Sequence, residues 1–301
     1  MPSELGDFLK GRRAALRPED VGLAAYGERR RVPGLRREEL CMLAGVSVTH
    51  YTRLEQGRTN SASPDLLNAI ARALRLNEDE SAHLRNLASP PPAVRPAPSR
   101  PEQASPSARQ LISAMADVPA LVLDRRNDVL AWNSLGHALL AGHLEFGCVK
   151  VSAQRPNLTR LLFLDEHFQD LYVNWAEEAT LAVASLRLIA GRHPDDRRLA
   201  ELVGQLTMQS HAFAERWNRH PVRTCTSGAK RMHHPSVGRM ELAFETLQIP
   251  GSPGQRIIAY SAEPASGSEA ALRLLASTVA DAAQDGRTRD GSRNPEAARR
   301  R

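Results

Sequence analysis

The sequence predicts an α+β protein, in which an all-α N-terminal domain is followed by a domain of helices packed on an antiparallel sheet. Three observations predict this: helical spacing of apolar residues in the first part of the chain, a proline-rich segment after it, and alternating apolar residues near the C-terminal end. The 301 residues are enough for two domains with cores of their own. We expect these domains at residues 1–88 and 108–281, joined by a linker at 89–107 and followed by a disordered basic tail at 282–301.

The first domain is predicted to contain five helices. A helix over residues 4–17 ends at Pro18, because the proline ring disrupts a continuing helix. Residues 34–57 predict two short helices joined by a turn at Gly45, since glycine enters the left-handed conformation of a helix end at little cost. Ser47 is placed to cap the second of these helices. The last two helices are expected at residues 64–76 and 77–88.

The second helix of residues 34–57 has the pattern of a DNA-reading helix. Its apolar stripe consists of Val48, Tyr51 and Leu54. A helix-turn-helix places such a second helix in the major groove. An ordinary pair of packed helices would explain the apolar spacing, but not the neighbouring arginines or the polar outward face. The local charge also favours DNA as the partner, because residues 29–58 contain seven arginines and three glutamates.

We assign roles to the residues of this unit. The residues expected to face base edges are Val48, Thr49, Thr52 and Arg53. The residues expected to hold phosphates are Arg36, Arg37, Tyr51 and Arg58. Ser47 and His50 complete the predicted DNA-binding set. The run Arg29–Arg31 is interpreted as an arm that contacts phosphates, against the alternative of a solvated charge run in a loop.

Composition limits the classes of protein further. The formal charge of +6 gives a mild preference for anionic partners. No apolar run approaches the length of a membrane span, and the N-terminus lacks the apolar core of a signal peptide. The three cysteines are far apart and form no disulfide framework, which fits a reducing compartment. We therefore expect a cytoplasmic protein that does not associate with membranes.

The second domain is predicted to have strands at both ends and helices between them. A helix over 108–117 precedes two short apolar strands, Ala120–Leu123 and Val129–Trp132. The helical middle is expected at 133–141, 157–165, 166–190, 195–206 and 209–219. Three later strands are expected at 224–233, 240–245 and 255–263, and a final helix at 268–280. This order predicts one mixed antiparallel sheet with helices packed on it.

No catalytic or metal-binding pattern stands out in this domain. Ser227 and Gly228 lie outside any GxSxG motif, and Lys230 lies outside any phosphate-binding loop. The neighbouring His233 and His234 would point to opposite faces of a strand, which is a poor arrangement for a metal. We expect no enzyme activity, no cofactor and no metal, while an acyl hydrolase that would use Ser227 stays open as an alternative.

Several long motifs resemble the MmyB-like family of Xre-type helix-turn-helix transcriptional regulators. They are PGLRREELCMLAGVSVTHYTRLEQGR (33–58), LAWN (130–133), LLFLD (161–165), AGRHPDD (190–196), RTCTSGAKRMHHPSVGRMELAFETL (223–247) and QRIIAYSAEP (255–264). The resemblance implies a helical DNA-binding head and a PAS-like ligand-binding domain that takes a fatty acid. Thr49 and His50 replace an acidic–aromatic pair that is common in the family, which leaves the operator sequence open.

The resemblance does not supply the ligand contacts, so we predict them from residue chemistry. An acyl chain needs an apolar lining, for which the candidates are Trp132, Phe163, Tyr172, Trp175 and Trp217. Its carboxylate needs a donor, for which the candidates are Arg223, Lys230 and His234. These aromatic residues would serve equally as plain core. The sequence therefore favours a ligand-responsive DNA-binding regulator that acts as a homodimer on double-stranded DNA, with a ligand-free dimerisation domain as the alternative.

Overall fold

The computed structural model describes residues 4–23, 34–59, 62–88, 102–219, 226–252 and 254–291, with side chains described as far as Asp281. The chain divides into two compact units. Unit 1 consists of Met1–Ala97 and Ala179–Thr224, and unit 2 of Pro98–Glu178 and Cys225–Arg301. The described part of unit 1 is helical, and unit 2 holds a five-stranded antiparallel sheet with helices. The predicted fold class is thus confirmed.

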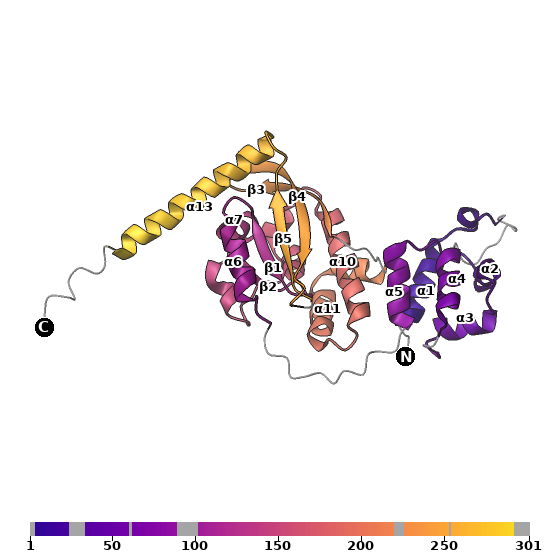
Figure 1. Ribbon diagram of the computed structural model, residues 1–301. Coiled ribbons are helices and arrows are strands. Elements are labelled where there is room, and N and C mark those ends of the chain that lie inside the picture. Colours follow the sequence, from indigo (N-terminus) through magenta and orange to yellow (C-terminus); the bar gives the residue numbers. More distant parts are fainter. Residues whose placement is uncertain are drawn as a thin grey trace, which may run out of the picture. The chain divides into compact units, whose positions relative to one another are not determined.

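The N-terminal part of unit 1 contains the predicted five helices (Figure 1). They are α1 (Glu4–Ala15), α2 (Arg37–Ala44), α3 (Val48–Glu55), α4 (Pro64–Ala73) and α5 (Glu78–Ala88), with a short 3₁₀ turn, η1 (Pro18–Val21), after α1. Gly45 ends α2 in the predicted left-handed conformation, with φ of 66°. Ser47 stands at the N-cap of α3 as predicted, but its hydroxyl makes no capping hydrogen bond. The run Arg29–Arg31 lies outside the described residues.

A buried carboxylate holds α3 to its neighbours. Glu55, at the end of α3, is only 1% exposed. Its carboxylate accepts hydrogen bonds from Nε of Arg13 on α1 at 2.8 Å and from Nε of Arg37 on α2 at 2.6 Å. The ring of Tyr51 is fully buried one turn earlier on α3. Because both arginines come from other helices, this one carboxylate fixes the position of α3 in unit 1.

Unit 1 also includes a second group of helices from much later in the chain. Helix α10 (Trp175–Arg192) begins in unit 2, and its residues from Ala179 onward belong to unit 1. Helices α11 (Arg197–Gln209) and α12 (His211–Asn218) follow it there. Leu188 of α10 is 3% exposed and shares the core of α1 to α5. The division by contacts therefore differs from the predicted domains, which placed residues 108–281 together in the second domain.

The contact between α5 and α10 leaves no room for a side chain at Gly191. A Cβ atom built there would lie 2.5 Å from Cε1 of His83. His83 itself is buried on α5, and its ring packs edge-on against Phe8 of α1 at a centroid distance of 5.1 Å. Nearby, the guanidinium of Arg187 lies 3.9 Å from the ring centroid of Trp217 and donates to that residue's carbonyl oxygen. The contact at Gly191 thus attaches α10 to the N-terminal helices, and Arg187 attaches α12 to α10.

Unit 2 is built on a sheet in the strand order β2-β1-β5-β4-β3, with all neighbours antiparallel (Figure 1). The strands are β1 (Ala120–Leu123), β2 (Val129–Trp132), β3 (Ser227–His234), β4 (Gly238–Gln248) and β5 (Arg256–Ser261). Alternation on β4 is as predicted, because Met240, Leu242 and Phe244 are buried while Glu241 and Glu245 are not. Strand β1 is buried along its whole length, so both faces of the sheet at this point are covered.

The helices of unit 2 largely follow the predicted positions. They are α6 (Pro106–Ala114), α7 (Ser134–Ala141), α8 (Leu158–Leu164), α9 (Glu166–Leu171) and α13 (Gly267–Gly291), with a 3₁₀ turn, η2 (Phe146–Lys150), that the sequence did not indicate. The single helix predicted at 166–190 is wrong, because the chain breaks after α9, where Tyr172 pairs with Met232 of β3 as a short bridge. Helix α13 continues past the predicted end, to Gly291, into the segment expected to be disordered.

Asn133, the last residue of the LAWN motif, ties three elements of unit 2 together. Its Oδ1 accepts hydrogen bonds from the amides of Ala120 on β1 and Gly136 on α7, at 3.1 and 2.7 Å. Its Nδ2 donates to the carbonyl oxygens of Ile112, Met115 and Val118, in and after α6. This motif residue therefore has a structural role.

We expect Glu55→Gln to destabilise the protein by about 2 kcal/mol at pH 7, because both arginines lose their anionic partner. Burial alone would raise the pKa of Glu55, but hydrogen bonds from Arg13 and Arg37 outweigh it and lower the pKa below 4.5. The folded state therefore binds a proton on the Glu55 carboxylate less tightly than the unfolded state does. The stabilisation by the ionised Glu55 is present above pH 4.5 and is lost as pH falls through the lowered pKa.

Urea unfolding of the wild type and of Glu55→Gln between pH 3 and pH 7 measures how this stabilisation depends on pH. Their free energies of unfolding should converge at the acid end. Glu38→Gln, an exposed position on α2, is the control and should change the free energy by no more than about 0.5 kcal/mol. An equal loss at every pH would contradict the assigned pKa direction.

We also expect two glycine-to-alanine changes in helices of unit 1 to have opposite signs. Gly204→Ala on α11 adds a Cβ with no atom within 4 Å, so it should stabilise the protein by about 0.5–1 kcal/mol through helix propensity. Gly191→Ala gains the same propensity but presses on the buried His83 ring, so a net loss of about 1–2 kcal/mol is expected. Chemical denaturation of both variants gives the two signs, and a gain at both positions would show that α5 and α10 are not in close contact.

Candidate functional site

The outward face of α3 carries most of the predicted base-reading residues. Val48, Thr49, His50 and Arg53 are exposed, and Thr52 is half-buried. Ser47, at the cap, is exposed as well. Arg36 before α2 and Arg58 after α3 are also exposed. The structure therefore leaves these side chains accessible to a partner, on a helix whose opposite face is held in the core by Tyr51 and Leu54.

Two predicted phosphate contacts have other roles. Tyr51 is fully buried and burial raises the pKa of its hydroxyl, so this hydroxyl does not reach the surface where a phosphate would lie. The prediction that Tyr51 contacts phosphate is wrong, because its whole side chain and not just its ring fills the core. Arg37 is partly exposed but its charge is paired with Glu55. Its first role is thus to position α3.

The predicted aromatic ligand residues do not form one pocket. Trp132 is 5% exposed on β2, and its indole N–H donates to the carbonyl oxygen of Phe146 at 3.0 Å. Phe163 and Trp175 instead pack edge-to-face on each other, with a centroid distance of 5.8 Å. Tyr172 packs against the main core of unit 2. Of the four, Trp132 alone lines the cavity described below.

Trp217 belongs to unit 1 and lies apart from this set. It is stacked on Phe213 of α12, with a centroid distance of 5.6 Å, and it holds the guanidinium of Arg187 on its ring. Burial lowers the pKa of Arg187 to about 10, against the opposing effect of Glu4 and Asp7, so this arginine stays charged at neutral pH. The role of Trp217 in the structure is therefore to attach α12 to α10.

The predicted polar anchors are engaged within the protein. Lys230 forms an ion pair with Glu178, and its ammonium lies 4.6 Å from the ring centroid of Phe244. His234 is buried, with Nε2 donating to the carbonyl oxygen of Ala138 at 3.0 Å and Nδ1 accepting from the amide of Ser236. Arg223 lies outside the described residues. The structure thus gives Lys230 and His234 internal partners in place of a ligand.

A cavity that the sequence did not indicate lies at the β2 edge of the sheet. Its volume is about 300 Å³, and it is bounded by α6, β2 and η2. Its apolar wall consists of Ile112, Leu130, Ala131, Trp132, Phe146 and Val149. Its cationic side chains are Arg109, Lys150 and Arg155. Apolar walls with a few charged groups are typical of sites for small molecules.

Sequence reasoning missed these cations for a physical reason. Arg109 is on α6, Lys150 ends η2 and Arg155 follows in a loop, so no periodic pattern connects them. The sheet edge brings them together. The only signal in the sequence was that Trp132 is a large aromatic residue on a short edge strand.

The remaining classes of site find no support in the described part of the chain. No three His, Cys, Asp or Glu side chains of the described residues form a group that could hold a metal ion. Ser227 lies at the exposed start of β3, opposite Glu245, in a position without a neighbouring histidine in its strand pair. Among the described helices, none is both long and apolar enough to cross a bilayer.

Comparisons with known families agree with this arrangement. The model of the MmyB-like transcription regulator ligand binding domain matches residues 104–275, and that of a helix-turn-helix domain matches residues 4–84. No curated protein matched the chain. The ligand-binding match includes α11 and α12, which lie in unit 1, so the family boundary and the division by contacts differ. With more than half of its length matched by one family model, the chain belongs to the MmyB-like transcription regulators and carries a helix-turn-helix domain at its N-terminal end.

Proposed function

We propose that the protein is a cytoplasmic, sequence-specific DNA-binding transcription regulator whose unit 2 senses a small apolar ligand, a fatty acid or similar lipid. The observation that carries the proposal is the division of α3 into two faces. Tyr51, Leu54 and Glu55 fix one face in the core, while Val48, Thr49 and Arg53 remain exposed on the other. Helix-turn-helix proteins read base edges with such an outward face.

The exposed residues of α3 have the chemistry that base reading needs. Arg53 can donate two hydrogen bonds to a guanine, and the methyl groups of Val48 and Thr49 can contact the methyl group of thymine. Arg36 and Arg58 flank this face and can contact phosphates. The pairing of Arg37 with Glu55 supports the proposal indirectly, because it holds the reading helix in a fixed position.

We also propose that the regulator acts as a homodimer. One head presents a single helix of eight residues, α3, to the groove. Two heads on a two-fold operator double the number of base contacts, which is the general arrangement for this kind of domain. The cavity beside Trp132 supports the sensing role, because it provides an apolar enclosure of a size suited to a small molecule.

Arg53→Ala tests the assignment of the reading face. Operators are first selected from random DNA with the wild-type protein. The variant should lose about 1–3 kcal/mol of discrimination between the selected operator and random DNA, because a bidentate base contact is removed. Arg58→Ala is the matched control: it should weaken binding to both DNAs alike and lower the salt slope by about one.

Fluorescence anisotropy over a range of salt concentrations gives both quantities. Unchanged discrimination in Arg53→Ala would exclude the proposed role of this arginine. Failure to enrich any sequence in the selection would exclude sequence-specific binding as a whole.

A further inference from the structure

A larger cavity lies within unit 1, between the N-terminal helices and the later helices α10 to α12. Its volume is about 600 Å³. One side is formed by the first turn of α1 and the last turn of α5. The other side is formed by the end of α10, residues 193–196, α11 and Trp217 of α12. All of the described residues that line this cavity belong to unit 1, so the sheet of unit 2 does not contribute to it.

Small residues on two helices keep this space open. They are Ala190 and Gly191 of α10 and Ala200 and Gly204 of α11. Packing requires the glycine at 191, since a Cβ there would meet the ring of His83. A Cβ at Gly204 would meet no atom within 4 Å, although glycine weakens the interior of a helix relative to alanine. The packing of unit 1 therefore does not account for Gly204, whereas an open cavity beside α11 does.

The wall of the cavity is largely apolar. Its larger apolar side chains are Leu5, Leu87, Pro194, Leu199, Val203 and Trp217. The Trp217 ring is fixed before any ligand arrives, because Phe213 stacks on it and the guanidinium of Arg187 lies 3.9 Å from its centroid. A cavity of this size with apolar walls and an aromatic ring is typical of a small-molecule site.

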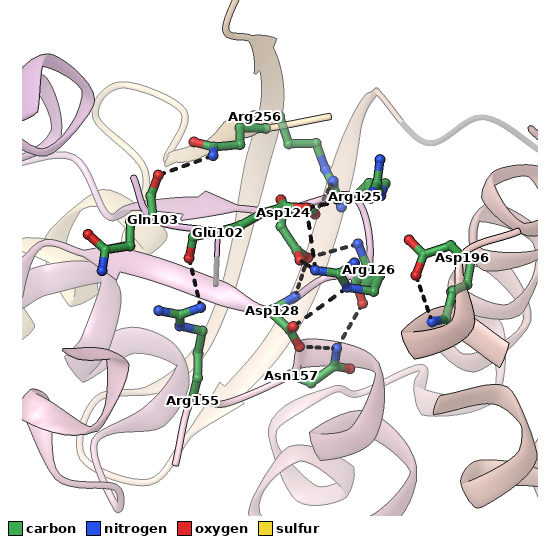
Figure 2. Close-up of polar contacts among 12 residues, drawn as sticks. Glu102, Gln103, Asp124, Arg125, Arg126, Asp128, Arg155, Asn157, Asp196 and Arg256 are labelled. Carbon is green, nitrogen blue, oxygen red and sulfur yellow. Dashed lines mark hydrogen bonds and ion pairs between the residues drawn. The ribbon is translucent and has the colours of Figure 1, made fainter. Parts of the chain in front are cut away.

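Apart from His193, the ionisable side chains that line the cavity are carboxylates. Glu4 and Asp195 are exposed, and neither forms an ion pair with the described residues. Asp196 also lines the cavity, and its Oδ1 caps α11 by accepting from the amide of Leu199 at 3.1 Å (Figure 2). No lysine or arginine is among the described lining residues. A cation in this cavity would therefore be attracted by carboxylates without displacing a lysine or arginine from its lining.

Carboxylates elsewhere in the protein are paired internally. Under the β1–β2 turn, the buried Asp124 pairs with Arg126 at 2.8 Å, and Glu102 pairs with the same arginine at 3.4 Å (Figure 2). That cluster has its own cation, so its carboxylates have a structural role. The contrast indicates that the carboxylates of the unit 1 cavity are available to a partner from outside.

The arginines near the cavity do not neutralise it. Three of them are exposed neighbours in sequence that do not line it, namely Arg192, Arg197 and Arg198. The buried Arg187 acts electrostatically on Glu4 from its place on the Trp217 ring. One cation does not balance the three carboxylates that line the cavity, so an anionic ligand would be repelled there and a cationic ligand attracted.

We propose that this cavity binds an amphipathic organic amine, and that its occupant holds α10 and α11 to α1 and α5. The ammonium group lies among Glu4, Asp195 and Asp196, and the apolar part lies against Trp217 and Leu199. The volume of about 600 Å³ is in the middle of the range for small-molecule sites, so it admits an aromatic or alkyl amine. This site is in unit 1, and it does not depend on the ligand proposed for unit 2.

The first test measures binding to the full-length protein, without DNA. The probes are tryptamine and phenethylamine, with tryptophol as the uncharged counterpart and indole-3-acetate as the anionic one. The indole N–H signal of Trp217 in a nitrogen–proton correlation spectrum, assigned with Trp217→Phe, should shift on addition of tryptamine. At this site tryptamine should bind about fivefold or more tightly than tryptophol at low salt, and the difference should shrink at high salt because salt screens exposed carboxylates.

Charge removal gives the second arm of the test. Glu4→Gln with Asp195→Asn should weaken tryptamine binding about fivefold or more, while tryptophol binding stays the same. Both positions are exposed, so the fold should tolerate the change. Glu19→Gln with Asp65→Asn is the matched control, because it changes the net charge equally at exposed positions outside the lining.

Filling the cavity gives the third arm. Gly204→Met places a side chain in the open space and should weaken tryptamine and tryptophol alike, about tenfold or more. Gln205→Met, at the next position of α11, is the control, since Gln205 does not line the cavity and its variant should bind like the wild type.

Hydrogen exchange followed by mass spectrometry tests the second half of the proposal. Tryptamine should slow exchange several-fold in peptides from the end of α5 and from α11, and it should leave a peptide from β3 unchanged. Binding without slower exchange in both helices would overturn the claim that the occupant holds them together.

Three results would overturn the site or its ligand class. They are absence of a Trp217 shift with both amines, equal or tighter binding of tryptophol or indole-3-acetate at Trp217, and unchanged tryptamine affinity in Gly204→Met. Because no DNA is present and the signal reports on unit 1, these results leave operator recognition by α3 and ligand sensing by unit 2 to be judged separately.

Discussion

The face of α3 that we propose reads DNA depends on one buried carboxylate. Glu55 accepts from Arg13 and Arg37, and these three residues come from three different helices, α1, α2 and α3. A carboxylate buried to this extent is stable only while it is paired, so the fold commits α3 to a single position relative to α1 and α2. The exposed side chains of α3 therefore reach a partner from a rigid support. Rigid placement of this kind is what base discrimination requires, because hydrogen bonds to base edges tolerate little displacement.

The second constraint is that the N-terminal helices of unit 1 are not the whole of that unit. Helices α10 to α12 share its core through Leu188, and the absent side chain of Gly191 lets α10 approach the buried His83. These helices come from the middle of the segment that the ligand-binding family model matches. The chain thus passes between its two units at three places: in the proline-rich segment between Ala97 and Pro98, within α10 between Glu178 and Ala179, and between Thr224 and Cys225. Unit 2 therefore has three covalent connections to unit 1, and the cavity beside Gln103 adjoins the first of them.

The sequence predicted what local patterns control, and it failed where distant elements meet. The turn at Gly45, the alternation on β4 and the two short strands β1 and β2 all follow from local chemistry, and the structure has them. Tyr51 was misjudged because a tyrosine hydroxyl on an amphipathic helix can point either way, and only the packing of α1 decides. Trp217 was grouped with the wrong residues because no local signal says that α12 packs in unit 1. The cations Arg109, Lys150 and Arg155 belong to a helix, a 3₁₀ turn and a loop, so no local pattern connects them. They come together only at the edge of the sheet.

The central claim is that occupancy of unit 2 changes DNA binding by unit 1, and one measurement tests it most directly. Binding of the full-length protein to its selected operator is titrated with and without saturating octanoate, a medium-chain fatty acid. The wild type is compared with the double variant Arg109→Met and Lys150→Met, which removes two of the cations that line the cavity beside Trp132. The account predicts that octanoate shifts the operator affinity of the wild type at least several-fold, and that the double variant keeps its basal affinity but does not respond at the same octanoate concentration. Equal operator affinity of the wild type with and without bound octanoate would contradict it.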